Sequence, residues 1–323
     1  MQNVEAIIVG GGPCGLSAAI ELKNIGLTPI VIEKGNIVNA IYNYPTHQTF
    51  FSTSEKLAIG DVPFLIEERK PRRNQALVYY REVVKMKDIQ VNRFEKVETV
   101  EKEPNGHFTV TTDKEIYKTP YVILATGYYD QPNYMHIPGE ELPKVQHYFK
   151  EAHPYFDTDV LVIGGKNSAV DAALELHKAK ARVTVAYRGS DYSPSVKPWI
   201  LPEFASLVRN EEISMHFNAR VKEIRENEVV LSVDGEEKVI ANDFVFAMTG
   251  YHPDHAFIRS MGVTIDEETG RPNYNPDTME TNIENLYIAG VLAAGNNANE
   301  IFIENGKFHG SFIAKHILSN GIN

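Results

Sequence analysis

Two residue types are almost missing from this 323-residue chain, which contains one cysteine, Cys14, and one tryptophan. A single cysteine excludes an internal disulfide, and it excludes every redox relay that needs two cysteines in one chain. No apolar run approaches the roughly 18–20 residues of a membrane-spanning helix. The histidines show no metal-ligand spacing. We therefore expect a cytoplasmic protein without a membrane partner and without a bound metal.

Positive charge is also in short supply. The chain has 32 Lys and Arg residues against 43 Asp and Glu residues, for a net charge of −11. This balance disfavours nucleic acid and anionic membranes as partners, because both repel a negatively charged protein. The composition is otherwise that of an ordinary globular protein, and the length suits about two domains.

Short β-branched runs that end in glycine recur along the chain, at 6–12, 122–127, 160–165, 244–250 and 286–290. Apolar runs without alternation are typical of strands that are covered on both faces, as in parallel sheets. These five runs therefore predict parallel strands.

Two of the runs are followed by helical patterns, at 16–26 and 168–180, and each helix leads to a further strand, at 29–34 and 182–188. These are two βαβ units. Alternating segments that predict antiparallel β-structure follow each unit; their ranges are 89–118 and 217–240. The chain is therefore predicted to be α/β, with two Rossmann-like, three-layer ββα dinucleotide-binding domains, one inserted into the other.

The first glycine loop has the spacing Gly10-x-Gly12-x-x-Gly15, between a predicted strand and a predicted helix. The first glycine permits the tight turn, the second lets the backbone approach a pyrophosphate, and the third lets the helix pack against the strand. Glu33 ends the next strand, where an acid accepts the ribose hydroxyls. This loop is predicted to bind a dinucleotide.

The second loop is less regular and reads Gly164-Gly165-Lys166-Asn167-Ser168-Ala169. Lys166 stands where a second glycine is expected, and its side chain limits the approach of a cofactor to the backbone. The next strand ends in Arg188 rather than in an acid. An arginine there suits a 2′-phosphate, so NADP(H) is favoured over NAD(H). The alternative is that Arg188 is only a solvated surface arginine and contacts no cofactor.

Both loops, together with ATG (125–127), MTGYHPD (248–254) and NLYIAG (285–290), resemble the thioredoxin reductase-like flavoproteins. The resemblance implies FAD in a domain of residues 1–127 and 249–323, and NADPH in a domain of residues 128–248. The residues assigned to the cofactors are Gly10, Gly12, Pro13, Cys14, Gly15, Glu33, Lys34, Val97, Ala125, Thr126, Gly127, Gly164, Gly165, Asn167, Ser168, Ala169, Arg188, Gly290, Glu300 and Ile301.

The resemblance also implies roles for several of these residues. Val97 meets the adenine through its backbone, residues 125–127 line the FAD side of the domain junction, and a helix that begins near Glu300-Ile301 approaches the flavin. Two features depart from the family pattern: the CxxC before the second loop is missing, and Val291 replaces the aspartate that usually follows Gly290. A dithiol relay is therefore excluded.

A narrower resemblance rests on the lone cysteine in GGGPCG, on YPTHQTFFSTSEKL (44–57), on GGKNSAVDAALEL (164–176) and on AGNNANEIFIENG (294–306). These segments are similar to the bacillithiol disulfide reductases of the YpdA type. That family implies a cytoplasmic FAD enzyme that uses NADPH to reduce bacillithiol disulfide, and a homo-oligomer built on dimers.

Cys14 is the expected redox residue, because a helix N-terminus lowers a thiol pKa and the thiolate is the species that attacks disulfides. We expect it to form a mixed disulfide with one half of the substrate, which reduced flavin then resolves. His47 is a candidate general acid for the leaving thiolate. The residues alone leave two alternatives: Cys14 as a small packed residue, and His47 as a loop residue near the flavin.

Other functions remain open from the residues. A flavin monooxygenase shares both dinucleotide folds, but its FxGxxxH motif fails here because Glu141 and Pro143 stand at the F and G positions. A ferredoxin or flavodoxin NADP reductase also lacks CxxC and needs no Cys14. The third alternative is a redox-sensing protein that binds NAD(P)H without turnover. Basic residues that could meet an anionic thiol are Lys56, Arg69, Arg72 and Arg73, and surface solvation explains them equally well.

Overall fold

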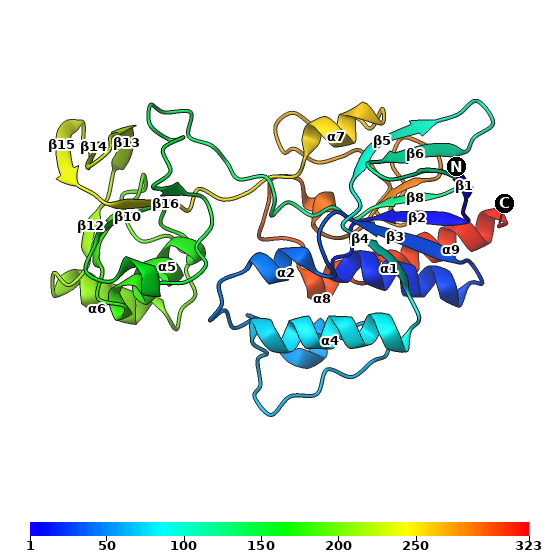
Figure 1. Ribbon diagram of the computed structural model, residues 1–323, viewed down its shortest axis with the longest axis horizontal. Helices are drawn as coiled ribbons and strands as arrows, with labels where there is room; N and C mark the ends of the chain where they lie inside the picture. The colour runs from blue at the N-terminus through cyan, green and yellow to red at the C-terminus, as the bar shows by residue number, and fades with distance from the viewer. Residues whose placement is uncertain (323) are drawn as a thin grey trace. The chain divides into compact units, whose positions relative to one another are not determined.

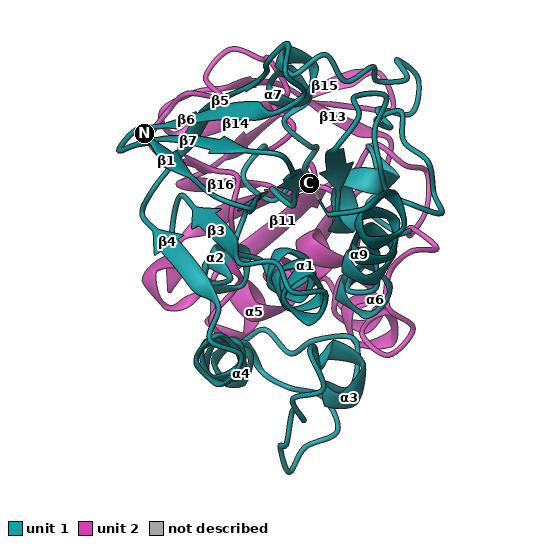
Figure 2. Cartoon of the chain, turned by 90° about the vertical axis from the view of Figure 1, so that its right-hand side faces the viewer, with its two compact units in different colours: residues 1–43, 47–131, 251–323 teal, residues 44–46, 132–250 magenta. Residues whose placement is uncertain are grey.

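The computed structural model describes residues 1–322. They form two compact units, coloured separately in Figure 2. Unit 1 comprises residues 1–43, 47–131 and 251–323, of which residue 323 is not described; unit 2 comprises residues 44–46 and 132–250.

Unit 1 is built on a five-stranded sheet in which every neighbouring pair is parallel (Figure 1). Its strands, in spatial order, are β17 (Leu286–Ile288), β8 (Val122–Leu124), β2 (Ala6–Val9), β3 (Pro29–Glu33) and β4 (Gln90–Arg93). The first four are buried along their whole length, as expected for strands covered on both faces. The parallel strands predicted from the sequence are confirmed here.

A second sheet in unit 1 has the order β1-β7-β6-β5. Its strands are β1 (Gln2–Asn3), β7 (Ile116–Thr119), β6 (Phe108–Thr112) and β5 (Val97–Lys102), and β5, β6 and β7 are antiparallel. The prediction of antiparallel structure over 89–118 is wrong for its first part. Strand β4 instead extends the parallel sheet beside β3, a long-range pairing that no local alternation reveals.

Helices accompany both sheets of unit 1, and Figure 1 labels most of them. They are α1 (Pro13–Asn24), α2 (Asn39–Asn43), α3 (Ser54–Leu57), α4 (Arg73–Met86), α7 (His255–Ser260), α8 (Ile303–Gly306), α9 (His309–Asn320) and a 3₁₀ turn η2 (Gly290–Ala294). Proline at the first position of α1 suits a helix start, where no amide hydrogen bond is lost. Helix α9 packs closely on α1, because a Cβ at Gly310 would lie 2.6 Å from the Cα of Ala18.

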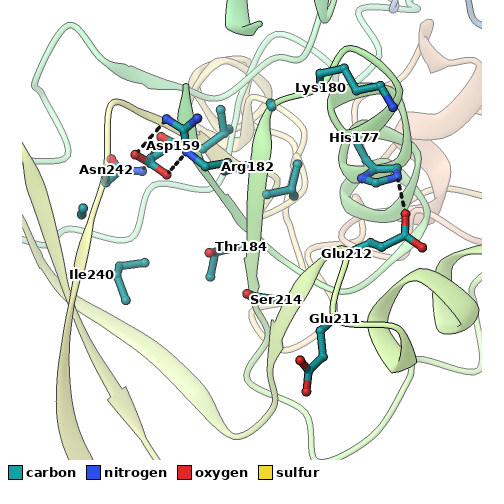
Figure 3. A pocket seen from close by; sticks show the side chains of 14 residues that line it. Asp159, His177, Lys180, Arg182, Thr184, Glu211, Glu212, Ser214, Ile240 and Asn242 are labelled. Atoms are coloured by element: carbon teal, nitrogen blue, oxygen red, sulfur yellow. Dashed lines mark hydrogen bonds and ion pairs between the residues drawn. The ribbon is translucent and has the colours of Figure 1, made fainter. Parts of the chain in front are cut away.

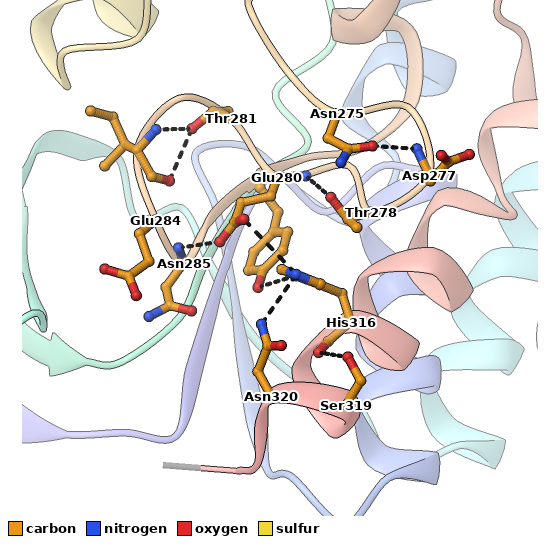
Figure 4. A network of polar contacts seen from close by, with 12 residues as sticks. Asn275, Asp277, Thr278, Glu280, Thr281, Glu284, Asn285, His316, Ser319 and Asn320 are labelled. Carbon is orange, nitrogen blue, oxygen red and sulfur yellow. Dashed lines mark hydrogen bonds and ion pairs between the residues drawn. The ribbon is translucent and has the colours of Figure 1, made fainter.

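A polar network fixes the C-terminal helix to strand β17 (Figure 4). The Tyr287 hydroxyl lies 3.1 Å from Nδ1 of His316, and Asn320 Nδ2 lies 3.1 Å from Nε2 of the same ring. Glu280 accepts from the Asn285 amide at 2.8 Å. Tyr287 is fully buried and burial raises the pKa of its hydroxyl, so that this group stays a neutral hydrogen-bonding partner of His316.

Unit 2 contains a second five-stranded parallel sheet, and its strands in spatial order are β12 (Ser214–His216), β11 (Arg182–Ala186), β10 (Asp159–Ile163), β16 (Phe244–Ala247) and β9 (Val145–Gln146). Helices α5 (Asn167–Lys178) and α6 (Leu201–Arg209) and the turn η1 (His153–Tyr155) complete this layer. Its core joins valines of β10 and β11 to alanines and leucines of α5.

Three antiparallel strands follow in unit 2, namely β13 (Ala219–Ile224), β14 (Glu228–Val233) and β15 (Glu236–Ala241). They confirm the antiparallel segment predicted over 217–240. No helix among residues 1–322 is long and apolar enough to cross a membrane. The same residues contain no group of three or more His, Cys, Asp or Glu side chains that could hold a metal ion.

Candidate functional site

The first glycine loop lies at the carboxyl ends of β2 and β3, which is the edge where open α/β sheets bind ligands. Gly10 has φ +111°, and a Cβ there would lie 2.4 Å from the Ala125 carbonyl oxygen. A Cβ at Gly15 would lie 2.1 Å from the Gly10 carbonyl oxygen. Both positions therefore require glycine, one for the turn and one for the packing of α1 against it.

Gly12 is different from these two glycines, because no atom lies within 4 Å of the place where its Cβ would be. The loop thus leaves open space beside the backbone at the start of α1, where amide groups point outward. This is the cradle that a pyrophosphate group needs. The residues present therefore fit the phosphates of a dinucleotide.

Glu33 closes the other side of the loop. Its side chain is 7% exposed, and its carboxylate accepts from the Gly11 and Gly35 amides, both at 2.7 Å. Burial raises the pKa of this carboxyl, and the two amide hydrogen bonds act against the rise. The neighbouring Lys34 forms an ion pair with Asp130 at 2.9 Å. An acid held at this strand end suits the ribose hydroxyls of a bound dinucleotide.

Cys14 lies in a slot between two glycines that are distant in sequence. A Cβ at Gly290 would lie 3.0 Å from the Cys14 Sγ atom, and a Cβ at Gly306 would lie 3.1 Å from it. Gly290 also has φ +76°, which favours glycine. The slot therefore accommodates the sulfur because both walls lack a side chain.

The slot changes the pKa of the Cys14 thiol in the direction opposite to the one expected from the sequence. Cys14 keeps part of its surface exposed, yet its surroundings desolvate the thiol and raise its pKa to about 12. The sequence predicted a lowered pKa from the helix N-terminus. That prediction is wrong for the chain itself, because burial disfavours the thiolate and raises the pKa.

His309, at the start of α9, was not predicted from the sequence. Its Nδ1 accepts from the Gly290 amide at 3.1 Å, and burial lowers the pKa of its ring to about 4. The ring is therefore neutral at physiological pH, with its proton on Nε2, because Nδ1 must accept. His309 holds Gly290 in place beside the Cys14 sulfur.

The remaining residues assigned to the FAD site lie in the same unit. Ala125 follows β8 and donates its amide to the Val9 carbonyl at 2.8 Å, and Gly127 two residues on has φ +70°. Thr126 lies between them. Val97 begins β5 and is buried.

Two of the predicted residues lie farther along the chain, before α8. Ile301 lies close to the slot, because its Cγ2 would be 3.1 Å from a Cβ at Gly306. Glu300 is exposed and pairs with Arg271, and it also accepts from Asn297. Helix α8 begins at Ile303, which is two residues later than predicted.

His47, the predicted general acid, is exposed on the segment between α2 and α3. Ser52, which the sequence did not single out, links that segment to helix α8. Its hydroxyl donates to the Glu304 carboxylate of α8 at 2.7 Å. Ser52 is buried, and α8 ends at Gly306 beside Cys14. This link fixes the segment to one wall of the slot.

The second glycine loop follows β10 in unit 2. Gly164 has φ +133°, and a Cβ there would lie 2.6 Å from the Met248 carbonyl oxygen and 3.2 Å from the Cβ of Ala169. Lys166 is exposed at the start of α5, and Ser168 is exposed two residues on. Gly164 and Ala169 thus provide the tight turn and the close helix packing of a dinucleotide-binding loop.

Two side chains near this loop have unexpected roles. The Asn167 amide group bridges to a neighbouring loop, donating to the Ser195 carbonyl at 2.9 Å and accepting from the Lys197 amide at 2.8 Å. The Tyr187 ring lies over Gly165, where a Cβ would be 2.3 Å from the ring, and beside Gly189. Arg188 is exposed two residues after the end of β11, which stops at Ala186 rather than at the predicted residue 188.

A cavity of about 500 Å³ lies elsewhere in unit 2 (Figure 3). It is lined by the first residues of three strands, Asp159, Arg182 and Ser214, and therefore lies at the amino edge of the sheet. Arg182 pairs with Asp159 at 2.8 Å, and His177 lies 3.4 Å from Glu212. Nucleotides bind such sheets at the opposite edge, so this cavity belongs to no cofactor site described above.

Comparison with known proteins gives the family. Residues 7–290 match the family model described as pyridine nucleotide-disulphide oxidoreductase. The chain is 69% identical over 319 residues to bacilliredoxin reductase Bdr of Bacillus subtilis strain 168, and the match covers 98% of each chain.

Two solved structures are also similar. The structure of bacillithiol disulfide reductase Bdr (YpdA) from Bacillus cereus has 68% identity and a TM-score of 0.98, covering 99% of this chain and 100% of its own. Thioredoxin reductase of T. acidophilum has 20% identity, a TM-score of 0.78 and full coverage of both chains, and it shares the fold. The predicted α/β fold with two dinucleotide-binding domains is thereby confirmed. The chain belongs to the pyridine nucleotide-disulphide oxidoreductases and is an NAD(P)H-dependent flavin oxidoreductase of the thioredoxin reductase-like type.

Proposed function

We propose that the protein is an NADPH-dependent FAD enzyme that reduces bacillithiol disulfide to bacillithiol, with Cys14 as the redox thiol. The observation that carries this proposal is the position of the chain's one thiol, which lies in the dinucleotide loop between Gly290 and Gly306. The similar Bacillus cereus protein is named for the same substrate, which supports the proposal.

The cofactor assignment rests on the two glycine loops. FAD is assigned to the domain of residues 1–127 and 249–323, because the space at Gly12 and the buried Glu33 carboxylate suit its pyrophosphate and ribose. NADPH is assigned to residues 128–248, where Arg188, two residues after β11, suits a 2′-phosphate. Replacing Arg188 with Ala should therefore raise KM for NADPH and leave KM for NADH unchanged.

The proposed chemistry on this chain is thiol–disulfide exchange. Cys14 loses its proton and attacks one sulfur of the disulfide, which breaks the S–S bond, releases one thiol and leaves a mixed disulfide on Cys14. FAD, when bound and reduced by NADPH, supplies the two electrons that cleave the mixed disulfide, and no second cysteine in the chain could supply them. Overall, the hydride of NADPH and one proton from solvent convert the disulfide into two thiols.

Among the steps that the protein's own residues carry out, deprotonation of Cys14 is the most demanding, since burial holds the pKa of its thiol near 12. His47 remains a proposed general acid for the leaving thiolate. His309 is neutral and uses Nδ1 to hold Gly290, so it keeps the slot in place and is not assigned the proton.

A second acceptor belongs in the test, because the Bacillus subtilis relative is named for bacilliredoxin, a protein, and not for the small disulfide. The experiment is anaerobic NADPH oxidation by the FAD-loaded protein with four acceptors: bacillithiol disulfide, glutathione disulfide, oxidised bacilliredoxin, and a ferredoxin or flavodoxin. Each acceptor is run with the wild type and with Cys14→Ala.

Turnover of bacillithiol disulfide that disappears in Cys14→Ala, with FAD content unchanged, supports the proposal. Normal turnover in Cys14→Ala makes the thiol a packing residue. Reduction of the ferredoxin or flavodoxin alone identifies an NADP reductase-like diaphorase. A separate aerobic assay identifies a monooxygenase if NADPH is consumed together with oxygen and a sulfide substrate.

We also infer a cytoplasmic homo-oligomer built on dimers, without nucleic acid or membrane partners. The low cysteine content and the net charge of −11 support the location and the excluded partners. Light scattering on the FAD-loaded protein tests the oligomeric state, and a monomer would contradict it.

A further inference from the structure

The two glycine loops of the chain share one backbone pattern. The Gly10 amide donates to the Ile32 carbonyl at 2.8 Å in unit 1, and the Gly164 amide donates to the Ala186 carbonyl at 3.0 Å in unit 2. Each bond joins the first glycine of a loop to the parallel strand that follows the helix. Both glycines also have a positive φ, of +111° and +133°. The two loops can therefore be compared residue by residue.

Glu33 fills the position after Ile32 and lies against two glycines. A Cβ at Gly11 would lie 3.1 Å from the Glu33 Cβ. The Glu33 carboxylate accepts from the Gly11 amide and from the Gly35 amide, both at 2.7 Å. An acid at this position suits the free ribose hydroxyls of a dinucleotide.

Tyr187 fills the equivalent position in unit 2, and it too lies against two glycines. A Cβ at Gly165 would lie 2.3 Å from Cγ of the Tyr187 ring, and a Cβ at Gly189 would lie 2.5 Å from Cε1 of the same ring. Gly165 and Gly189 stand at the same spacing in this loop as Gly11 and Gly35 in the first. The ring therefore occupies the space that the ribose acid fills in unit 1.

An aromatic ring changes what this position offers to a nucleotide. Within residues 1–322, neither the Gly165 amide nor the Gly189 amide finds an acceptor, whereas Glu33 accepts from both counterparts in unit 1. The ring also brings no negative charge, so it does not repel a 2′-phosphate as a carboxylate would. Unit 2 thus lacks the acid that holds a free 2′-hydroxyl.

The residue that follows the ring, Arg188, is exposed, and no carboxylate in the described part of the chain pairs with it. Its counterpart in unit 1, Lys34, is paired with Asp130 at 2.9 Å. The Asn218 amide donates to the Gly189 carbonyl at 2.9 Å, so the backbone just after Arg188 is fixed. The guanidinium therefore extends from a fixed backbone with its charge available to an anion.

We propose that Tyr187 is a specificity-determining residue whose ring takes the place of the ribose acid, so that unit 2 accepts NADPH and discriminates against NADH. Arg188 attracts the 2′-phosphate, and Tyr187 keeps this position free of a carboxylate that would repel the phosphate and bind the 2′-hydroxyl of NADH. The inference rests on the assignment of NADPH to unit 2 and adds a second determinant of that preference. It does not depend on which disulfide is reduced.

The test converts this position into its unit 1 counterpart with Tyr187→Glu. Reduction of the bound flavin by NADPH and by NADH is followed anaerobically, without a disulfide, and calorimetry measures the binding of 2′,5′-ADP and of 5′-ADP. Tyr187→Glu should reduce the preference for NADPH over NADH about 100-fold, with weaker binding of 2′,5′-ADP and tighter binding of 5′-ADP. A merely structural role of the ring would weaken both ligands equally.

Three further variants separate charge, ring and fold. Tyr187→Phe keeps the ring and should retain the wild-type preference. Tyr134→Glu makes the same change at an exposed tyrosine of unit 2 and should retain the preference as well. Tyr187→Gln covers the case in which Tyr187→Glu does not fold. Glutamine can accept from an amide without a negative charge, and it should narrow the preference about ten-fold by improving NADH alone.

An unchanged preference in Tyr187→Glu, or in Tyr187→Gln where Tyr187→Glu does not fold, would overturn the role of Tyr187. An equal loss of both nucleotides would overturn it too, and so would a wild type whose flavin is reduced equally well by NADH. Because the reaction contains no disulfide, each of these results leaves the reductase activity standing. A failure to reduce bacillithiol disulfide likewise leaves the result for Tyr187 standing.

Discussion

Gly306 and Cys14 are 292 positions apart in the chain, yet a Cβ on Gly306 would lie 3.1 Å from the Cys14 sulfur. A contact this short is tighter than ordinary van der Waals packing, so one atom must move if a side chain is added. The Cys14 sulfur and Gly306 at the end of α8 are therefore packed against each other with no room for an added side chain.

Gly306→Ala should destabilise the protein by about 1–3 kcal/mol, because the methyl group overpacks the slot. Cys14→Ala should relieve part of this loss in the double variant, since removing the sulfur opens the space. Urea unfolding of the wild type, both single variants and the double variant gives the coupling energy. Additive effects would show that the sulfur and Gly306 do not compete for space.

The raised pKa of Cys14 predicts slow alkylation. Below a pKa of about 12 the thiolate fraction rises ten-fold per pH unit, so iodoacetamide labelling of the folded protein should accelerate steadily from pH 8 to pH 11. At pH 8 the thiolate fraction should be roughly 1,000-fold lower than in the urea-unfolded chain, whose thiol has an ordinary pKa. Labelling that reaches a plateau near pH 7 would contradict burial as the dominant effect.

His309 predicts a loss of stability in acid. Its folded-state pKa of about 4 lies below the ordinary value of 6.5, so the unfolded chain binds the proton first as the pH falls from 6.5 to 4. Protonation of Nδ1 would also remove the acceptor for the Gly290 amide. Between pH 7 and pH 5 this ring should reduce the free energy of unfolding by about 2 kcal/mol.

The measurement is urea unfolding at both pH values for the wild type, His309→Gln and His107→Gln, an exposed histidine in the same unit. His309→Gln should flatten the pH dependence, whereas His107→Gln should retain it. An unchanged slope in His309→Gln would assign the acid sensitivity to other groups.

Glu33→Gln should weaken FAD binding and also lower the stability of the glycine loop. The carboxylate accepts from the Gly11 and Gly35 amides, and the glutamine amide can accept from only one of them. The remaining buried amide loses its partner, at a cost of about 1–3 kcal/mol. Flavin fluorescence titration should show weaker FAD binding in Glu33→Gln, with exposed Glu98→Gln as the control. Equal affinities would remove Glu33 from the FAD site.

Local patterns in the sequence were sufficient for much of the fold. The runs at 6–12 and 160–165 predicted buried parallel strands because residues covered on both faces need no alternation. The glycine spacing from Gly10 to Gly15 predicted the turn, since Gly10 has φ +111° and Gly15 packs on the Gly10 carbonyl oxygen five residues away. These features depend on near neighbours, which a sequence displays directly.

Other features depend on residues that are far apart, and only the tertiary structure decided them. Strand β4 pairs with β3 in a long-range contact, Gly290 and Gly306 close on Cys14, and burial raises the pKa of the Cys14 thiol. Arg73 is buried although it lies in a basic run. The sequence by itself determined which backbone shapes could form, because those follow from local sterics and hydrophobic pattern. The tertiary structure decided which side chains are desolvated and which groups surround them. Desolvation depends on how segments that are distant in the sequence pack together.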